Sequence, residues 1–191
     1  MRKLGMAAGA LVVAGAGLVG TTGSADGATG HMGRAASAKG CATSWGSGTK
    51  SAVESATMRL KVIVTSQSRC YDRMIFHVKG VHSNISYHVG YVTTFQQDGS
   101  GERIPVRGGG ILQIFVSAPS YDPETGSPTY AGKAGKPLPG VTVAGYRTFK
   151  DAKFGASFEG RTQIGLGVRA KLPFRAVQSG DKLIVDVAHT W

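Results

Sequence analysis

The chain has 191 residues and a formal net charge of +11, from 22 lysines and arginines against 11 aspartates and glutamates. At about 100–200 residues per domain, this length accommodates one globular domain and an N-terminal extension. Charged residues make up only 17% and hydrophobic residues 41%, which excludes an acidic disordered tail, a coiled coil and a multi-span membrane protein. The 29 glycines also argue against a helix-rich fold, because glycine inside a helix costs about 1 kcal/mol relative to alanine.

Residues 1–28 have the pattern of a secretory signal peptide. Two basic residues precede the uncharged stretch Leu4–Gly20, and small residues follow, with cleavage expected after Ala25 or Ala28. The alternative is a retained anchor, but this stretch is rich in Gly and Ala and shorter than the roughly 20 strongly apolar residues of a spanning helix. We therefore expect export, an extracellular or cell-wall-associated mature chain, and no integral membrane span in that mature chain.

The rest of the chain is expected to form a flexible tether and one globular domain held together by a disulfide. Residues 29–40 are rich in Gly, Ala and Ser and predict a flexible tether, which leaves 41–191 for the globular domain. Cys41 and Cys70 are too few for a disulfide-dense miniprotein or a zinc site made only of cysteines. In an exported chain they predict a disulfide, worth roughly 3.5 kcal/mol in the loop-entropy model.

Apolar and polar residues alternate with a period of two from residue 57 onward, as in half-buried β-strands. Segment 41–56 is expected to be irregular. The fold class is therefore all-β, an antiparallel β-sandwich of about nine strands. Pro105 argues for an edge position of its strand, because proline donates no ladder hydrogen bond. The expected strands are 57–65, 73–79, 85–95, 104–106, 112–116, 141–149, 156–168, 172–177 and 182–189.

Segments 73–79 and 85–95 are expected to form an antiparallel hairpin closed by a loop at 80–83. In that register the two histidines His77 and His88 become diagonal neighbours on the outer face of the sheet. They could begin a surface metal site, but a third ligand with fitting spacing is missing, so we predict no metal and no cofactor. The register places three apolar pairs on one face: Val78 with Ile85, Phe76 with Tyr87, and Met74 with Val89.

A long loop at 118–140 contains five of the seven prolines of the chain. Loops of this length either carry a function or are tolerated insertions, and the sequence leaves both alternatives open.

No catalytic constellation stands out among the polar residues. Asp72, Glu159 and Asp186 are therefore interpreted as partners of structural ion pairs on the sheet surface. The expected arginine partners are Arg73, Arg161 and Arg169. Asp186 has the opposite strand parity from its apolar neighbours, which suits pairing with Arg73.

A series of motifs follows in order along the domain: Cys70-Tyr71-Asp72-Arg73 with the following Met-Ile-Phe, Tyr87–Val92, 98–101, 107–112, 145–149, 157–160, 165–175 and 183–189. Together these motifs resemble the AMIN-like domain family of secreted proteins from high-GC Gram-positive bacteria. This resemblance implies a compact β-sandwich related to the AMIN domain, a non-catalytic module that targets cell-wall amidases and other envelope proteins to peptidoglycan.

We accordingly expect a secreted, monomeric, non-catalytic module of the cell envelope. A positive charge favours encounter with anionic partners, so the expected ligand is a cell-wall glycan such as peptidoglycan or an anionic wall polymer. Another envelope protein is a further candidate partner, and nucleic acid is not expected because no aromatic–basic stacking motif is present. The predicted ligand-binding residues are Arg73, Tyr91, Arg161, Arg169 and Arg175.

Two alternatives remain at this point. One is a small wall hydrolase that uses Glu159 or Asp186 together with His189. The other is a secreted protein-binding or inhibitor module that presents loop 118–140. The second alternative predicts that deletion of the loop abolishes partner capture without lowering thermal stability.

Overall fold

A computed structural model describes residues 40–41, 43–53, 59–80 and 84–191. The predicted signal peptide and all but the last residue of the predicted tether lie outside the described residues. Nothing in the described part of the chain forms a helix of the length and hydrophobicity that crossing a bilayer requires.

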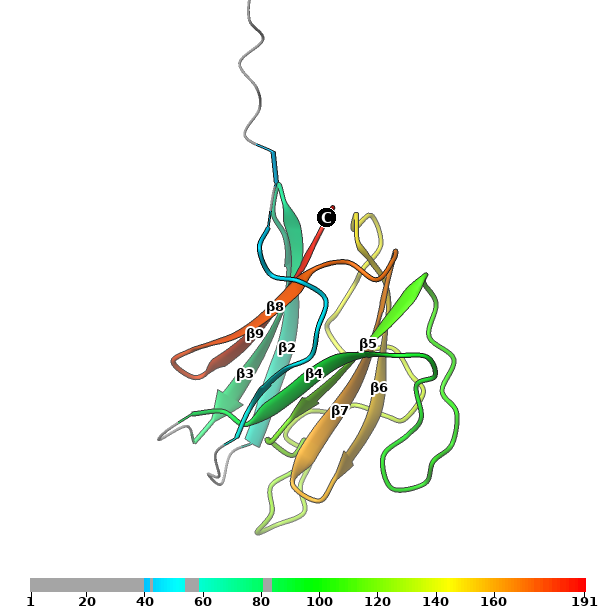
Figure 1. Ribbon diagram of the computed structural model, residues 1–191. Helices are drawn as coiled ribbons and strands as arrows, with labels where there is room; N and C mark the ends of the chain where they lie inside the picture. The colour runs from blue at the N-terminus through cyan, green and yellow to red at the C-terminus, as the bar shows by residue number, and fades with distance from the viewer. Residues whose placement is uncertain (1–39, 42, 54–58, 81–83) are drawn as a thin grey trace, which may run out of the picture. The chain divides into compact units, whose positions relative to one another are not determined.

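The described residues form nine strands in two antiparallel sheets that pack face to face (Figure 1), which confirms the predicted all-β sandwich. The five-stranded sheet has the order β1 (Lys50–Ala52), β4 (Tyr87–Val92), β5 (Gly110–Val116), β7 (Arg161–Val168), β6 (Phe149–Phe158). The four-stranded sheet has the order β2 (Arg59–Gln67), β3 (Tyr71–Lys79), β9 (Lys182–Ala188), β8 (Phe174–Ser179).

The core lies between the sheets and follows from the alternation of the strands. Successive side chains of a strand point to opposite faces, so every second apolar residue enters the core. Each large apolar side chain buried in this way stabilises the fold by roughly 1.5–3 kcal/mol. Fully buried core residues include Leu60, Met74, Phe76, Leu112, Ile114, Ile164, Leu166, Phe174, Leu183 and Val185.

The expected hairpin between 73–79 and 85–95 is wrong. β3 pairs with β2 and β9, whereas β4 pairs with β1 and β5 in the other sheet. Val78 and Ile85 are both buried, but Val78 lies on β3 of the four-stranded sheet and Ile85 lies in the connection before β4 of the five-stranded sheet. His77 and His88 consequently lie on different sheets, so they are not neighbours and cannot begin a shared metal site.

Four strand boundaries also differ from the expectation. The segment 41–56 contains the edge strand β1, while 104–106 and 141–148 form no strand. The segment 156–168 belongs to two strands, β6 and β7, because Glu159 and Gly160 both adopt positive φ, at 45° and 75°. Two consecutive residues with positive φ are the geometry of a tight hairpin turn.

A loop at 93–109 covers part of the outer face of the five-stranded sheet. Phe95 and Ile104 are buried there although neither lies in a strand. Glycines of β7 make this contact possible: a Cβ on Gly165 would lie 2.7 Å from the Phe95 ring, and one on Gly167 would overlap the carbonyl oxygen of Arg107. The four-stranded sheet has its own outer face, which carries the candidate site described below.

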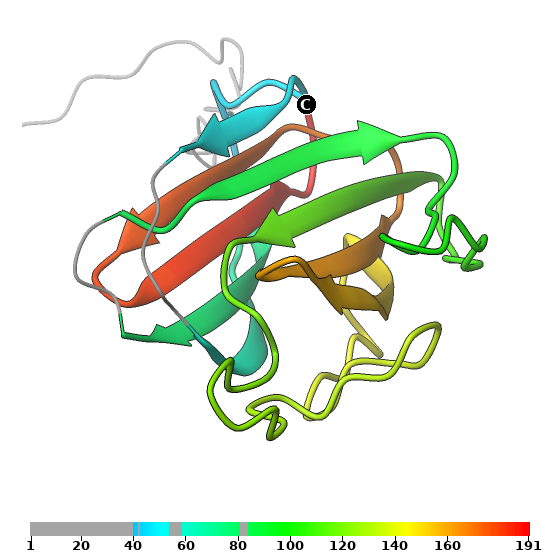
Figure 2. The same cartoon turned by 90° about the horizontal axis from the view of Figure 1, so that it is seen from below.

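The proline-rich segment 118–140 is an integral part of the fold. The Phe154 amide donates to the Lys136 carbonyl at 3.0 Å, and the Gly135 amide donates to the Phe154 carbonyl at 2.9 Å. The segment therefore pairs with the edge strand β6, alongside which it runs in Figure 2. Tyr130 and Leu138 are buried in the core cluster, so we now expect removal of this loop to lower the stability of the domain, contrary to the expectation from the sequence.

The predicted disulfide between Cys41 and Cys70 is confirmed, with Cα atoms 5.1 Å apart and a sequence separation of 29 residues. We expect the double variant Cys41→Ser, Cys70→Ser to lose about 3.5 kcal/mol of unfolding free energy, because the bond restricts the unfolded chain. For a domain of this size the loss corresponds to a Tm lower by roughly 7–14 °C in calorimetry. An unchanged Tm after reduction of the unmodified protein would contradict this prediction.

Candidate functional site

Arg73, Asp186 and Arg175 lie side by side on the outer face of the four-stranded sheet. The strand register places Asp186 of β9 between Arg73 of β3 and Arg175 of β8. The buried Asp186 carboxylate accepts hydrogen bonds from Arg73 Nε at 2.6 Å and Arg175 Nε at 2.8 Å. The hydrogen bonds that Arg73 donates to the Asp186 carboxylate raise the pKa of Arg73 above its ordinary value. The ion pair that strand parity suggested for Asp186 is therefore present, with a second arginine added.

Two aromatic rings flank the Arg175 guanidinium. Its Cζ atom lies 4.5 Å from the ring centroid of Trp45 and 5.7 Å from that of Tyr71. Arg73 lies over the same Tyr71 ring at 5.1 Å and donates a hydrogen bond to the Tyr71 hydroxyl at 3.2 Å. Cations over aromatic faces are held by the ring quadrupole, so both guanidinium groups have defined positions.

The disulfide explains why Trp45 reaches this sheet. Cys41 is bonded to Cys70, the residue before β3, so the segment that follows Cys41 begins beside Tyr71. The Phe174 amide then donates to the Gly46 carbonyl at 2.9 Å and ties the segment to the start of β8. The two attachments hold Trp45 over the sheet from either side.

An apolar row lies next to the charged row on the same outer face. The registers align one residue from each strand of the sheet, Val64, Ile75, Ile184 and Val177. The first three are half-buried and Val177 is 39% exposed. We call the combined surface the aromatic–arginine face, made of Trp45, Tyr71, Arg73, Arg175, Asp186, Val64, Ile75, Val177 and Ile184.

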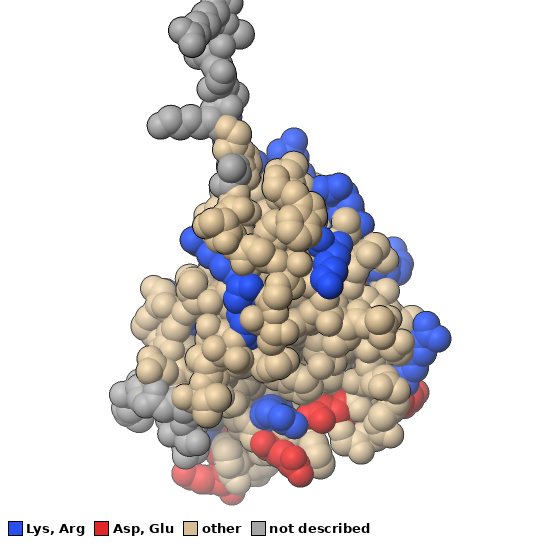
Figure 3. Space-filling model, viewed as in Figure 1, with Lys and Arg blue, Asp and Glu red and all other residues tan. Residues whose placement is uncertain are grey.

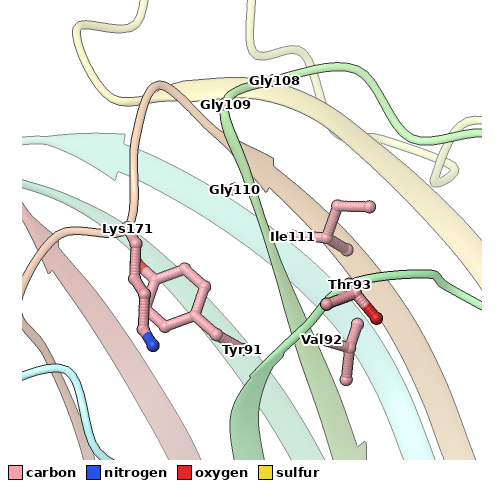
Figure 4. A pocket seen from close by; sticks show the side chains of 8 residues that line it. All are labelled: Tyr91, Val92, Thr93, Gly108, Gly109, Gly110, Ile111 and Lys171. Carbon is pink, nitrogen blue, oxygen red and sulfur yellow. The ribbon is translucent and has the colours of Figure 1, made fainter.

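Of the five predicted ligand-binding residues, the structure brings only Arg73 and Arg175 together. Tyr91 lines a separate hollow of about 410 Å³ with Lys171 and the glycines Gly108–Gly110 (Figure 4). Its hydroxyl donates to the Leu172 carbonyl at 2.8 Å and accepts from the Leu172 amide at 3.0 Å. Burial raises the pKa of Tyr91 to about 12. These bonds give Tyr91 a structural role in joining β4 to the connection before β8.

The two other predicted residues lie elsewhere. Arg161 pairs with Asp98 at 3.1 Å and lies over the Phe115 ring at 5.0 Å, on the five-stranded sheet. Arg169 follows β7 and donates to the carbonyl of His189, at the end of the sandwich where the C-terminus lies in Figure 1. The five residues therefore do not form one site.

Asp72 has a different partner from the arginine that was expected. Its buried carboxylate accepts the amides of Thr148 at 2.6 Å and Phe149 at 3.0 Å, and its other oxygen lies 2.9 Å from His189 Nε2. His189 Nδ1 lies 3.1 Å from the Arg69 carbonyl oxygen. Asp72 thus joins three chain segments at one end of the sandwich, and its role is structural.

The structure does not assemble the residues of the hydrolase alternative. Glu159 occupies the β6–β7 turn and forms no ion pair with any described residue, which corrects its predicted structural pairing. Asp186 is bonded to its two arginines, and His189 faces Asp72 rather than Asp186. In Figure 1 the β6–β7 turn and the C-terminus lie at opposite ends of the sandwich. Over the described residues, no three His, Cys, Asp or Glu side chains gather as metal ligands do.

Sequence reasoning missed Trp45, Tyr71 and the apolar row as parts of the site. Tyr71 shares strand parity with Arg73, which is a signal that they lie on one face. The disulfide between Cys41 and Cys70 was a second signal, because it brings residues just after Cys41 close to Tyr71. The register that aligns Val177 with Ile184 and Ile75 could not be read from the sequence, because it depends on which strands are neighbours.

Comparison with known proteins gives one match. No curated protein and no solved structure matches the chain significantly. The family model of the AMIN-like domain matches residues 58–189, more than half of the chain and nearly all of the sandwich. The chain therefore belongs to the AMIN-like domain family.

Proposed function

We propose that the protein is a secreted, non-catalytic module of the cell envelope that binds a wall glycan, peptidoglycan in the first instance, through the aromatic–arginine face. Membership of the AMIN-like family supports a binding role associated with the cell wall. The N-terminal sequence pattern supports export, with a signal peptide at 1–28 and a tether at 29–40 before the domain at 41–191. The mature protein acts as an extracellular or wall-associated monomer without a cofactor.

The observation that carries the proposal is the Arg175 guanidinium held between Trp45 and Tyr71 on a sheet face that is partly exposed. The side chain of Arg175 is 37% exposed, so part of its guanidinium group faces solvent and can donate hydrogen bonds to a ligand. An arginine fork recognises carboxylates, which peptidoglycan carries on its sugars and peptides. Aromatic rings with one polar edge suit ligands that are apolar on one face and hydrated on the other, as sugar rings are.

The apolar row extends the same surface across all four strands. It follows one line of residues across the sheet and is only half-exposed, so it suits an extended ligand better than a small molecule. Two arginines and one aspartate leave one net positive charge beside this row. A neutral to weakly anionic polymer that lies along the sheet matches these features.

A substitution at the exposed end of the row tests the proposal. Val177→Asp adds a charge on the proposed contact surface while removing few packing contacts, since Val177 is 39% exposed. We expect it to reduce co-sedimentation with purified peptidoglycan, stripped of covalently attached anionic polymers, by at least roughly tenfold, as for a buried charge at an interface core. Arg175→Gln should reduce binding in the same direction.

The matched controls are Phe158→Asp and Arg103→Gln, at exposed positions on the other sheet and its covering loop. Both should bind like the unmodified protein. Equal binding by Val177→Asp and Phe158→Asp would refute the assignment of the surface. Soluble muropeptides measured in the same supernatants address catalysis, because release by the unmodified protein and not by Glu159→Gln would establish the hydrolase alternative.

A further inference from the structure

Charge is distributed unevenly over the sandwich. Figure 3 shows most Lys and Arg over the half of the visible face nearer the C-terminus, and Asp and Glu at the opposite end, where basic atoms also lie among them. The exposed or partly exposed acids of the described residues lie in loops and turns. They are Asp98, Glu102, Asp122, Glu124, Glu159 and Asp181.

Three exposed arginines from distant parts of the sequence meet at the other end. Arg147 Nη1 donates to the Arg69 carbonyl at 3.5 Å. Arg169 donates to the carbonyl of His189, whose ring nitrogen Nδ1 lies 3.1 Å from the same Arg69 carbonyl. The Arg169 amide also donates to Thr148, the neighbour of Arg147, at 2.8 Å. These bonds place the three arginine positions within one small area.

Two exposed lysines widen this area. Lys150 lies three residues after Arg147, and its Nζ donates to the Tyr146 carbonyl at 3.2 Å. Lys171 lies two residues after Arg169 at the rim of the Tyr91 hollow. We call these five residues the basic end: Arg69, Arg147, Lys150, Arg169 and Lys171.

No described carboxylate pairs with any residue of the basic end. The acids on the neighbouring strands are Asp72, Asp151 and Asp186, and all three are buried. Asp72 faces His189, Asp151 lies within 4 Å of Arg107 and Lys153, and Asp186 lies between Arg73 and Arg175. Among the described residues, no Asp or Glu side chain therefore pairs with the positive charge of the basic end.

We propose that the basic end is a binding site for a phosphodiester-linked anionic polymer. Guanidinium groups match the paired unesterified oxygens of a phosphodiester with two parallel hydrogen bonds. A hollow of about 340 Å³ lined by Tyr146, Lys150 and Arg107 lies beside the arginines and provides room for a polymer unit. Several cations from three segments suit a repeating ligand, which presents one phosphate after another along its chain.

A membrane surface fits the basic end less well. Interfacial binding requires apolar side chains that enter the headgroup region together with the cations. Among the strongly exposed large apolar residues of the described chain, only Trp191 is close in sequence to a residue of this area, His189. The basic end therefore offers several charges but, among the described residues, a single strongly exposed large apolar side chain to insert.

This site goes beyond the proposed glycan site and does not depend on it. The aromatic–arginine face uses Arg73 and Arg175, which Asp186 neutralises in part, whereas the basic end uses other residues with no acid. A failure at one surface therefore leaves the other proposal intact. Val177→Asp serves as the variant that should lose peptidoglycan and keep the polymer.

The test is calorimetric titration of the full mature chain with synthetic poly(glycerol phosphate). We expect the triple variant Arg69→Gln, Arg147→Gln, Arg169→Gln to bind at least roughly tenfold more weakly, and the slope of log affinity against log salt to fall by roughly 2–3 because fewer phosphates are neutralised. Arg69→Gln with Lys171→Gln is a second variant, since neither side chain donates a hydrogen bond to a described residue. It should lose affinity in the same direction without a change in Tm.

The matched control is Arg103→Gln, Lys133→Gln, Lys136→Gln, which removes the same charge from exposed loop positions. It should change affinity by less than roughly threefold, because these residues are not part of the basic end and screening by salt weakens their interaction with a ligand bound there. If both triple variants lost affinity equally, binding would depend on net charge alone and the basic end would not be the binding site. Equal affinity for poly-glutamate of matched charge would overturn the phosphodiester assignment, and so would binding to phosphatidylglycerol vesicles without binding to poly(glycerol phosphate).

Discussion

Asp72→Ala is expected to destabilise the domain by about 3–5 kcal/mol, the range typical for removal of one partner from a buried charged network. The substitution leaves the amides of Thr148 and Phe149 and the Nε2 atom of His189 without their acceptor, and all of these groups are buried. Unfolding in guanidinium chloride, followed by tryptophan fluorescence, measures the loss. The consequence should extend to the basic end, because Asp72 fixes the segments that carry Arg147 and Arg169.

Two further variants separate this mechanism from a general effect of losing a carboxylate. Asp72→Asn keeps an oxygen that can accept both amides, so it should cost clearly less than Asp72→Ala. Asp181→Ala removes an exposed carboxylate 4.0 Å from Lys182 and should change stability by less than about 0.5 kcal/mol. A loss below about 1 kcal/mol for Asp72→Ala would show that the buried network is not important for the fold.

Alternation predicted most strands of this fold but could not predict how they pair. The residues Met74, Phe76 and Val78 and the residues Ile85 and Val89 were correctly assigned to one apolar side. Two strands whose apolar residues match in parity can pair in one sheet or face each other across a core, and the sequence pattern is the same in both cases. Here the chain crosses between the layers after β3, so the apparent hairpin register reflects the shared core.

Buried residues outside the strands caused the other errors. Phe95, Ile104 and Leu138 are as buried as strand residues, yet they lie in loops that cover a sheet face or an edge strand. Their burial depends on glycines far away in sequence, such as Gly165 beneath the Phe95 ring. The apolar residues in 104–106 and 141–148 therefore indicated buried or half-buried positions correctly and strand conformation incorrectly.

The residues of the candidate sites could be predicted only where the alternation of side chains along a single strand was enough to place them on one face. Parity alone suggested that Asp186 pairs with Arg73, because each points away from the core on its own strand. The meeting of Arg69, Arg147 and Arg169 depends instead on three segments joined by hydrogen bonds to backbone carbonyls. The net charge of the whole sequence does not indicate where in the fold the arginines cluster.

Tyr130→Ala is expected to cost about 3–5 kcal/mol, as for other aromatic residues truncated in a core. Tyr130 is 6% exposed, its ring lies 6.3 Å from that of Phe154, and its hydroxyl donates to the Pro139 carbonyl at 2.9 Å. Burial of this side chain also raises the pKa of Tyr130. Chemical unfolding measures the loss, and Glu124→Ala, at an exposed position of the same loop, is the matched control with less than about 0.5 kcal/mol.

Deletion of the whole segment 118–140 should then have a larger effect than either point variant. It removes Tyr130 and Leu138 from the core and uncovers the edge of β6 at Lys153, where Pro137 now pairs. An exposed edge strand can pair with another chain, so we expect the deletion variant to aggregate or to unfold at lower temperature. A deletion variant that stays monomeric in light scattering and keeps its Tm would show that the loop is an insertion, and would restore it as a candidate for partner capture. The loss expected here means that any partner of this loop must be sought with point variants at its exposed tip.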